Sequence, residues 1–160
     1  MQFKIESVNS CETLSAHTFE IKAGLAYNFL YELNYEYPFF RTWYTERVLK
    51  NMHRGTRHLD VVIYNKRIAA VLILKREQHE KKICTLRVHP AFQGNGIGRQ
   101  LILRAFTLLE TERPLISISD QRITQFSKLL KYFNFKLSDI KQGFYKKNIE
   151  EFIFNGTLSS

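Results

Sequence analysis

The sequence contains few residues of the kinds that mark specialised classes of protein. Its only two cysteines, Cys11 and Cys84, provide neither a metal-ligand spacing nor a disulfide framework. The longest apolar run, Ile68 to Leu74, is too short to span a bilayer. The first residues, Met-Gln-Phe-Lys-Ile-Glu, are too polar for a signal peptide. We therefore expect a cytoplasmic protein with no metal site and no membrane partner.

Acidic residues are also scarce, and the resulting positive charge is concentrated in one stretch. The 160 residues carry 24 Lys and Arg against 15 Asp and Glu, a formal net charge of +9. Residues 47–82 contribute most of this excess, with Asp60, Glu77 and Glu80 as their only acids. Such a stretch is most simply a solvated face, but it also suits a polyanionic cofactor or a nucleic acid such as a charged tRNA. The length and the 44% hydrophobic content predict one domain spanning residues 1–160.

The most informative segment runs from Val88 to Leu101, with the sequence Val-His-Pro-Ala-Phe-Gln-Gly-Asn-Gly-Ile-Gly-Arg-Gln-Leu. A mostly apolar run precedes it, and apolar residues recur at helical spacing after it, which predicts a strand, a tight turn and a helix. Glycine at Gly94, Gly96 and Gly98 permits a sharp turn and a close backbone approach to a ligand. Because the first amides of a helix have no acceptor inside it, such a turn can bind a phosphate or diphosphate.

Two familiar phosphate-binding motifs do not fit this segment. A P-loop requires a lysine followed by serine or threonine after its last glycine, but Arg99 and Gln100 stand here. The dinucleotide motif, Gly-x-Gly-x-x-Gly, requires a third glycine, but this chain has Arg99 there if the motif starts at Gly94 and Leu101 if it starts at Gly96. The motif also lies between parallel strands. Residues 58–64 and 67–76 are separated only by Asn65-Lys66, which predicts an antiparallel hairpin instead.

The pattern Gln93-x-x-Gly96-x-Gly98 resembles the acyl-CoA-binding signature of the GNAT superfamily of N-acetyltransferases. The preceding segment, Leu86-Arg-Val-His-Pro90, is similar to the strand that leads into that signature loop. Leu130-Lys-Tyr-Phe-Asn-Phe135 is similar to the Tyr-x-x-x-Gly-Phe segment of the same family. The resemblance covers roughly residues 58–155.

The resemblance implies a single α/β (α+β mixed sheet) GNAT-like domain with a central, mostly antiparallel sheet flanked by helices. Its element order is β-α-α-β-β-β-α-β-α-β-β, and the hydrophobic pattern supports this order independently. We expect Asp120 to cap the late helix and Pro38 to interrupt the early helical region. The expected strands are residues 2–8, 58–64, 67–76, 81–88, 115–118, 135–140 and 143–154, and the expected helical regions are 12–33, 39–52, 96–110 and 121–133.

The resemblance also implies acetyl-CoA as the cofactor and acetyl transfer to a primary amine of a small molecule or a protein. The backbone of Leu86–Val88 would pair with the pantetheine arm, and an amide near Val88 would polarise the thioester. The amides of residues 93–98 would hold the diphosphate, with the side chains of Gln93 and Arg99 in reach of phosphates. The expected cofactor-binding residues are Leu86, Arg87, Val88, Gln93, Gly94, Asn95, Gly96, Ile97, Gly98 and Arg99.

The chain departs from the family pattern at both catalytic positions. Many members place a tyrosine on the late helix, where it acts as the general acid. This sequence has Leu130 at that position, and Tyr132, two residues later, lies on a different face of the helix. Tyr145 is the replacement acid that we predict, although an aromatic packing role is the simpler interpretation. Some members use a glutamate on the central strand as base. Lys82 takes that position here, so Glu80, which shares its strand parity, becomes the candidate base.

The segment between the first two strands is expected to bind the acceptor. Arg41, Trp43 and Tyr44 are the substrate-binding candidates, and part of this aromatic stretch also serves core packing. Two alternatives remain open at this stage. One is a toxin-like acetyltransferase acting on aminoacyl-tRNA, suggested by the basic stretch. The other is a non-catalytic acyl-CoA-binding regulatory module, suggested by Leu130 and Lys82. A homodimer is one option for the assembly.

Overall fold

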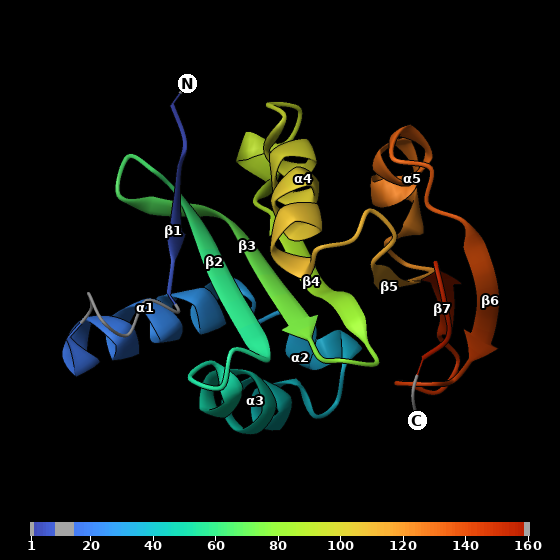
Figure 1. Ribbon diagram of the computed structural model, residues 1–160, viewed down its shortest axis with the longest axis horizontal. Coiled ribbons are helices and arrows are strands. Elements are labelled where there is room, and N and C mark those ends of the chain that lie inside the picture. The colour runs from blue at the N-terminus through green and yellow to red at the C-terminus, as the bar shows by residue number, and fades with distance from the viewer. Residues whose placement is uncertain (1, 9–14, 159–160) are drawn as a thin grey trace.

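The computed structural model describes residues 2–8 and 15–158, so Cys11 lies outside the described residues. The described residues form one seven-stranded mixed sheet in the order β1-β2-β3-β4-β5-β7-β6, with helices on both faces (Figure 1). All neighbouring strands are antiparallel except β4 and β5, which confirms the predicted mixed and mostly antiparallel sheet. The strands are β1 (Lys4–Ser7), β2 (Arg57–Tyr64), β3 (Arg67–Arg76), β4 (Lys81–Val88), β5 (Leu115–Ser119), β6 (Leu137–Gln142) and β7 (Glu150–Phe154).

The helices form two groups on opposite faces of the sheet (Figure 1). The first group is α1 (Ala16–Phe29), α2 (Leu33–Glu36) and α3 (Phe40–Thr42), and α3 continues through a π-helical turn, Trp43–Val48, into a 3-10 turn, Leu49–Asn51. The second group is α4 (Ile97–Leu109) and α5 (Ile123–Tyr132). The predicted interruption at Pro38 is confirmed, because α2 ends before it and α3 begins after it.

The strand β3 holds the two layers together. It follows β2 through the two-residue turn Asn65-Lys66, whose φ values of 48° and 64° belong to the turn type that matches strand twist. Residues 69–74 of β3 are all buried, because one set packs under α4 and the other under α1 and α3. A strand covered on both faces is expected to be apolar throughout, as this one is.

A β-bulge in β4 lies where β4 and β5 begin to separate. Ile73 pairs with Thr85 and Leu74 pairs with Ile83, so Cys84 is an extra residue without a partner in β3. A bulge bends its strand and redirects side chains. Beyond it, β4 and β5 separate, since the two strands pair only at Lys82–Leu115 and Ile83–Ile116. The backbone edge of β4 that faces β5 is therefore left without a strand partner from Thr85 to Val88.

A buried ion cluster fixes α4 over the sheet. The carboxylate of Asp60 on β2 is fully buried and contacts the guanidinium of Arg104 on α4 and Nε2 of His58, the latter at 2.7 Å. Burial raises the pKa of Asp60, but the hydrogen bonds from His58 and Arg104 outweigh burial and hold this pKa below its usual range. The cluster thus joins the helix that follows the glycine turn to the centre of the sheet.

Two local predictions were wrong. Asp120 does not cap α5, which begins at Ile123 without a side-chain cap; instead the backbone of Asp120 bonds Glu150 and ties β5 to β7. Tyr145 was expected on a strand but lies in the loop between β6 and β7. The reason is backbone geometry, since Gly143 and Asn148 adopt positive φ values of 68° and 66° and turn the chain there.

Candidate active site

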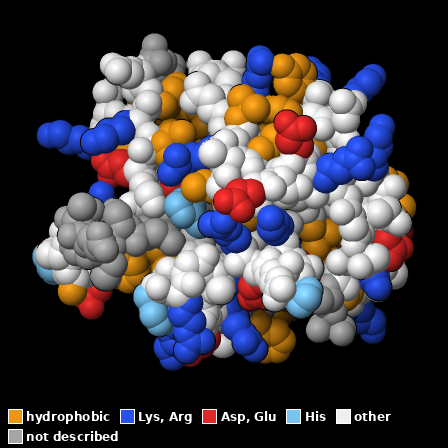
Figure 2. Space-filling view, viewed as in Figure 1, with side chains coloured by type: hydrophobic (Ala, Val, Ile, Leu, Met, Phe, Trp, Pro, Cys, Tyr) orange, Lys and Arg blue, Asp and Glu red, His pale blue; other side chains and the backbone are white. Residues whose placement is uncertain are grey.

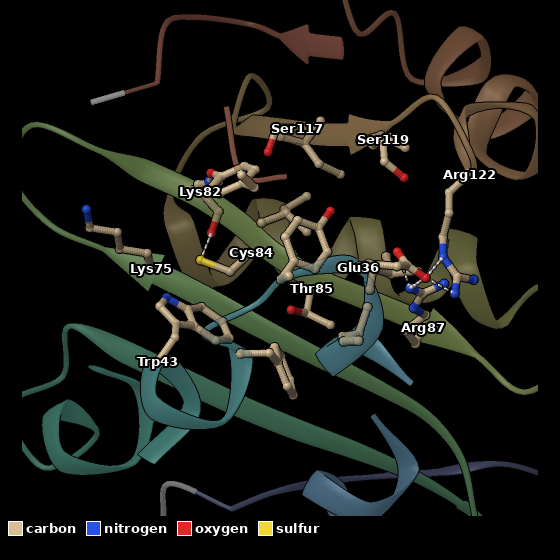
Figure 3. Close-up of a pocket in the computed structure, with 18 of the residues that line it drawn as sticks. Glu36, Trp43, Lys75, Lys82, Cys84, Thr85, Arg87, Ser117, Ser119 and Arg122 are labelled. Carbon is tan, nitrogen blue, oxygen red and sulfur yellow. Dashed lines mark hydrogen bonds and ion pairs between the residues drawn. The ribbon is translucent and has the colours of Figure 1, made fainter. Parts of the chain in front are cut away.

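A cavity of about 380 Å³ lies where β4 and β5 separate (Figure 3). Its walls come from both faces of the sheet, because Phe126 of α5 and Trp43 beside α3 both line it. Thr85 and Cys84 both face the cavity, because the bulge places two successive side chains on one side of β4. Further lining residues are contributed by α2, by β5 and by the β6–β7 loop.

One end of the cavity is closed by a glutamate held between two arginines. Glu36 of α2 accepts hydrogen bonds from Nη2 of Arg87, at 3.3 Å, and from Nε of Arg122, at 2.8 Å (Figure 3). All three side chains are mostly buried. One carboxylate between two guanidinium groups leaves an excess of one positive charge. Nη1 of Arg87 is buried and has no hydrogen-bond partner among the described residues.

The other end carries lysines. Nζ of Lys82 donates to the hydroxyl of Tyr145 at 3.2 Å, and Nζ of Lys75 donates to Oε1 of Glu80 at 2.8 Å. Tyr145 and Glu80, the two residues predicted for catalysis, therefore both line the cavity although they come from distant parts of the chain.

Trp43 and Arg57 form the wall beside these lysines. The guanidinium of Arg57 lies 5.9 Å from the centre of the Trp43 ring, and Nη1 of Arg57 donates to the sulfur of Cys84 at 3.4 Å. Burial raises the pKa of the Cys84 thiol above its usual range, so the thiol is favoured over the thiolate. This argues against Cys84 as a nucleophile and for a packing role.

A buried tyrosine–glutamate pair adjoins the cavity. The hydroxyl of Tyr37, a lining residue, donates to Oε1 of Glu151 at 3.2 Å, and the rings of Tyr37 and Tyr145 meet edge to face at 5.3 Å. Glu151 on β7 is 1% exposed, and Oε2 has no hydrogen-bond partner among the described residues. Burial raises the pKa of Glu151 to about 7, and burial with the charge of Glu151 raises the pKa of Tyr37 well above its usual range.

The glycine turn lies at the end of β4 toward which the two strands open. Gly94 and Gly96 have φ values of 81° and 80°, and a Cβ on either would meet nothing within 4 Å. The first hydrogen bond inside α4 runs from the amide of Gln100 to the carbonyl of Gly96. The preceding amides of the first turn have no acceptor within the helix. This is the geometry of an anion-binding turn.

The remaining residues of the turn mostly shape it. The side chain of Gln93 donates to the carbonyl of Val88 at 3.2 Å, and that of Asn95 donates to the carbonyl of Phe92 at 3.1 Å. Gly98 has a packing role, because a Cβ there would lie 2.9 Å from a methyl carbon of Leu129 on α5. The other predicted cofactor residues divide between core and surface: Leu86, Val88 and Ile97 pack into the core beneath α4, and Arg99 lies over the ring of Tyr132 at 4.6 Å.

The predicted acceptor residues are not all brought together. Trp43 lines the cavity, but Arg41 is exposed outside it, and Tyr44 is 1% exposed with its hydroxyl bonded to the carbonyl of Ala23 at 2.7 Å. Leu130 is a buried core residue, so the described late helix offers no tyrosine at that position, whereas Tyr132 is 58% exposed.

Sequence reasoning missed Glu36, Tyr37 and Glu151. A signal existed for Glu151, which shares the inward strand parity of the fully buried Ile153. Glu36 and Tyr37 carried no comparable signal, because they lie in the irregular stretch before Pro38.

Within the described ranges, no group of three or more His, Cys, Asp or Glu side chains is arranged to hold a metal ion. None of the described helices is both long enough and apolar enough to cross a membrane.

Comparison with known proteins agrees with this geometry. The model of the Acetyltransferase (GNAT) family matches residues 26–118. No curated protein matches the sequence. A GNAT-family structure from Desulfovibrio desulfuricans superposes with a TM-score of 0.68 at 14% identity, covering 96% of this chain and 97% of the other. The ribosomal-protein-S18-alanine N-acetyltransferase from Escherichia coli gives 0.64 at 15% identity, covering 99% and 97%.

PaiA N-acetyltransferase from Thermoplasma acidophilum, solved in complex with coenzyme A, gives a TM-score of 0.63 at 19% identity, covering 96% of this chain and 98% of the other. At these identities the structures establish a shared fold. The family model covers more than half of the chain and includes the bulged strand, the glycine turn and α4. The chain therefore belongs to the GNAT family of acetyltransferases.

Proposed function

We propose that this protein is an acetyl-CoA-dependent N-acetyltransferase that acetylates a primary amine. The observation that carries the proposal is the arrangement of two binding elements: the unpaired edge of β4 borders the cavity, and the glycine turn follows the carboxyl end of the same strand. Family membership supports the acyl transfer, and the Thermoplasma relative was solved with coenzyme A.

The residues present fit coenzyme A. The edge of β4 from Thr85 to Val88 offers backbone groups to which the pantetheine arm can pair like an additional strand. The amides at the start of α4, beside the open space at Gly94 and Gly96, would hold the diphosphate. When bound, the cofactor supplies the acetyl group as a thioester. Backbone amides of β4 near Thr85, where the acetyl end would enter the cavity, would stabilise the oxyanion that develops on the acetyl carbonyl.

Tyr145 is our candidate for the acid that protonates the leaving thiolate. Because Lys82 donates to its phenol oxygen, the hydroxyl hydrogen of Tyr145 is available to another acceptor in the cavity. A positioned acid typically contributes a factor of about 100 to 10,000. We expect Tyr145→Phe to lower kcat by at least about tenfold while the affinity for CoA stays unchanged. An unchanged kcat would exclude Tyr145 as the acid.

The base is better assigned to Glu151, acting through Tyr37, than to Glu80. The carboxylate of Glu80 is held by Lys75, so accepting a proton there would cost an ion pair. Glu151 accepts the hydroxyl hydrogen of Tyr37, and Tyr37 lines the cavity. In the proposed transfer the amine gives its proton to the oxygen of Tyr37, and the hydrogen of Tyr37 passes to Glu151. A carboxyl with a pKa of about 7 is suited to this role near neutral pH.

The distribution of charge does not favour aminoacyl-tRNA as the acceptor. The basic residues between 47 and 82 are dispersed, since Arg57, Lys75 and Lys82 line the cavity while Lys66 and Arg67 occupy the tip of the β2–β3 hairpin. On the face shown in Figure 2 the Lys and Arg side chains lie in separate groups. A tRNA site would need a continuous basic surface.

The decisive experiment measures CoA binding and turnover together. Calorimetry should show that Gly96→Glu weakens CoA binding by at least about 100-fold, since bulk and negative charge would stand beside the diphosphate. Gly96→Ala measures the contribution of backbone strain alone. Both alanine and glutamate would have to adopt the positive φ of Gly96, but only glutamate adds a negative charge. Gly24→Glu, at an exposed site on α1 with open space around it, is the matched control.

Turnover is followed as thiol release from acetyl-CoA over a panel of primary amines. Equal CoA affinity in wild-type protein and Gly96→Glu would overturn the cofactor site. Normal CoA binding with no thiol release for any amine would overturn the enzymatic proposal and favour the non-catalytic binding module.

A further inference from the structure

The cavity is more positive than a site for an ordinary amine requires. Among the described residues that line it, five basic side chains face two carboxylates, Glu36 and Glu80, a formal excess of three positive charges. An ammonium group entering this cavity would meet a repulsive potential, so the cavity favours either a neutral amine or a molecule that also carries negative charge.

Both lining carboxylates are already engaged. Glu36 is shared by Arg87 and Arg122, and Glu80 is bonded to Lys75. Neither carboxylate is therefore positioned to bind an incoming ammonium without losing an existing ion pair.

Lys82 is the basic group best placed to receive an acid. It stands on β4 two residues before the bulge at Cys84, and its partner is the neutral hydroxyl of Tyr145 at 3.2 Å. Within the described residues, no carboxylate lies within 4.0 Å of its amine. In Figure 3 Lys82 lies at the end of the cavity opposite the Glu36–Arg87–Arg122 cluster.

Cationic and aromatic side chains surround Lys82. Arg57, itself 8% exposed, lies over the ring of Trp43 in the same part of the cavity, and Tyr37 and Tyr145 supply further aromatic surface. A charge-assisted hydrogen bond from Lys82 to an acid group would be stronger than a hydrogen bond between two neutral groups.

The carboxyl end of β4 is assigned to the cofactor under the proposed function, so the Lys82 end remains for the acceptor. A cavity of about 380 Å³ that must also admit the acetyl end of the cofactor suits a small molecule better than a folded protein segment. Nearby cations also lower the pKa of an amine, so more of the bound acceptor is neutral and ready to attack.

We propose that the acceptor is a small primary amine that carries a carboxylate or a phosphate, with its acid group bound by Lys82. This inference rests on the proposed function and specifies its substrate class. The acid group fixes the acceptor at one end of the cavity while the amine points toward the separation between β4 and β5.

The test compares matched pairs of acceptors that differ in the acid group: glycine with glycinamide, γ-aminobutyrate with butylamine, and phosphoethanolamine with ethanolamine. The readout is the ratio of kcat/KM within each pair, measured by thiol release. We expect the acid-bearing member of at least one pair to be preferred by at least about tenfold, the worth of one charge-assisted hydrogen bond. The carboxylate and phosphate pairs distinguish the two kinds of acid.

Variants of Lys82 separate recognition from any loss of rate. Lys82→Met should reduce the preference by about tenfold even if kcat falls for both members, because a ratio is insensitive to a shared effect on Tyr145. Lys82→Arg should retain the preference. Lys66→Met, the same chemical change at the exposed hairpin tip, should leave the ratio unchanged.

The outcomes distinguish this inference from the function on which it rests. Equal or better use of the neutral member of every pair overturns the inference alone. A preference that survives Lys82→Met also overturns it. No turnover with any amine while CoA binds overturns the proposed function, and the inference falls with it.

Discussion

At the scale of single residues, the buried carboxylate of Glu151 is the most unusual group in the molecule. A carboxyl at 1% exposure has lost its hydration, and one hydrogen bond from Tyr37 does not replace it. The folded protein therefore holds a proton on Glu151 up to about pH 7, whereas the unfolded chain releases it near the usual value of 4.5. Burying this group sacrifices stability, as expected of a residue kept for chemistry.

The sign of the resulting pH dependence follows from the raised pKa. The folded state binds this proton more tightly than the unfolded state, so stability falls as pH rises from about 4.5 through about 7 and is level above. Glu151 should lower the free energy of unfolding of the wild-type protein by about 3 kcal/mol between pH 5 and pH 8. We expect Glu151→Gln to remove this decrease, measured by urea unfolding at several pH values.

Glu20→Gln, at an exposed carboxylate on α1, is the control and should leave the wild-type pH dependence unchanged. If Glu151→Gln shows the same pH slope as the wild-type protein, Glu151 is already ionised in the folded state. The proton relay through Tyr37 would then have no base of the required strength.

At the scale of elements, the position of α4 depends on Asp60. This helix begins at the glycine turn, so its placement sets where the anion-binding amides point. Asp60 joins β2 to α4 through Arg104 and is itself fully buried. Removing one member of a buried pair leaves the other charge poorly compensated, which costs more than the loss of an exposed pair.

We expect Asp60→Asn to lower the free energy of unfolding by about 3 kcal/mol at pH 7. The difference in stability between the two proteins should become smaller in acid. The pKa of Asp60 is lowered in the folded state, so the wild-type protein itself loses the stabilisation from Asp60 as the pH falls through that pKa. Glu110→Gln, which removes the exposed Arg76–Glu110 pair at the other end of α4, should cost less than about 0.5 kcal/mol. Equal effects of the two variants would contradict the anchoring role.

At the scale of the whole molecule, the described chain should unfold as one unit. The two larger core clusters lie on opposite faces of the sheet, but β3 contributes to both, so neither of them can separate without exposing the other. The single tryptophan, Trp43, belongs to the layer of α1–α3, whereas far-UV circular dichroism reports on both layers.

We therefore expect tryptophan fluorescence and far-UV circular dichroism to give coincident urea transitions, as two-state unfolding requires. An earlier fluorescence transition would mean that the layer of α1–α3 unfolds separately. That result would contradict the prediction of one domain over residues 1–160.

The predictions made from the sequence agree best with the structure where they depend on interactions between residues close together in the chain. Asn65-Lys66 predicted a hairpin because only these two residues separate two apolar runs, and Gly94 and Gly96 marked the glycine turn because glycine readily adopts positive φ. Tyr145 was predicted on a strand, but it lines the cavity from a loop. Arg41 and Tyr44 were predicted for the acceptor site, and the three-dimensional packing of the irregular helical segment turned one outward and the other into the core.

The amino-acid sequence alone determined the order of elements, the family and the location of the glycine turn, because backbone preferences and hydrophobic periodicity act over a few residues. The chemistry of the cavity was decided only by the tertiary structure. Glu36, Lys82 and Glu151 are far apart in the chain and acquire their partners, their burial and their charge states when β4 bends away from β5 and β7 completes the sheet. The charge state and the loss of hydration of a side chain depend on the groups that surround it in space, and the spacing of residues along the chain does not determine those groups.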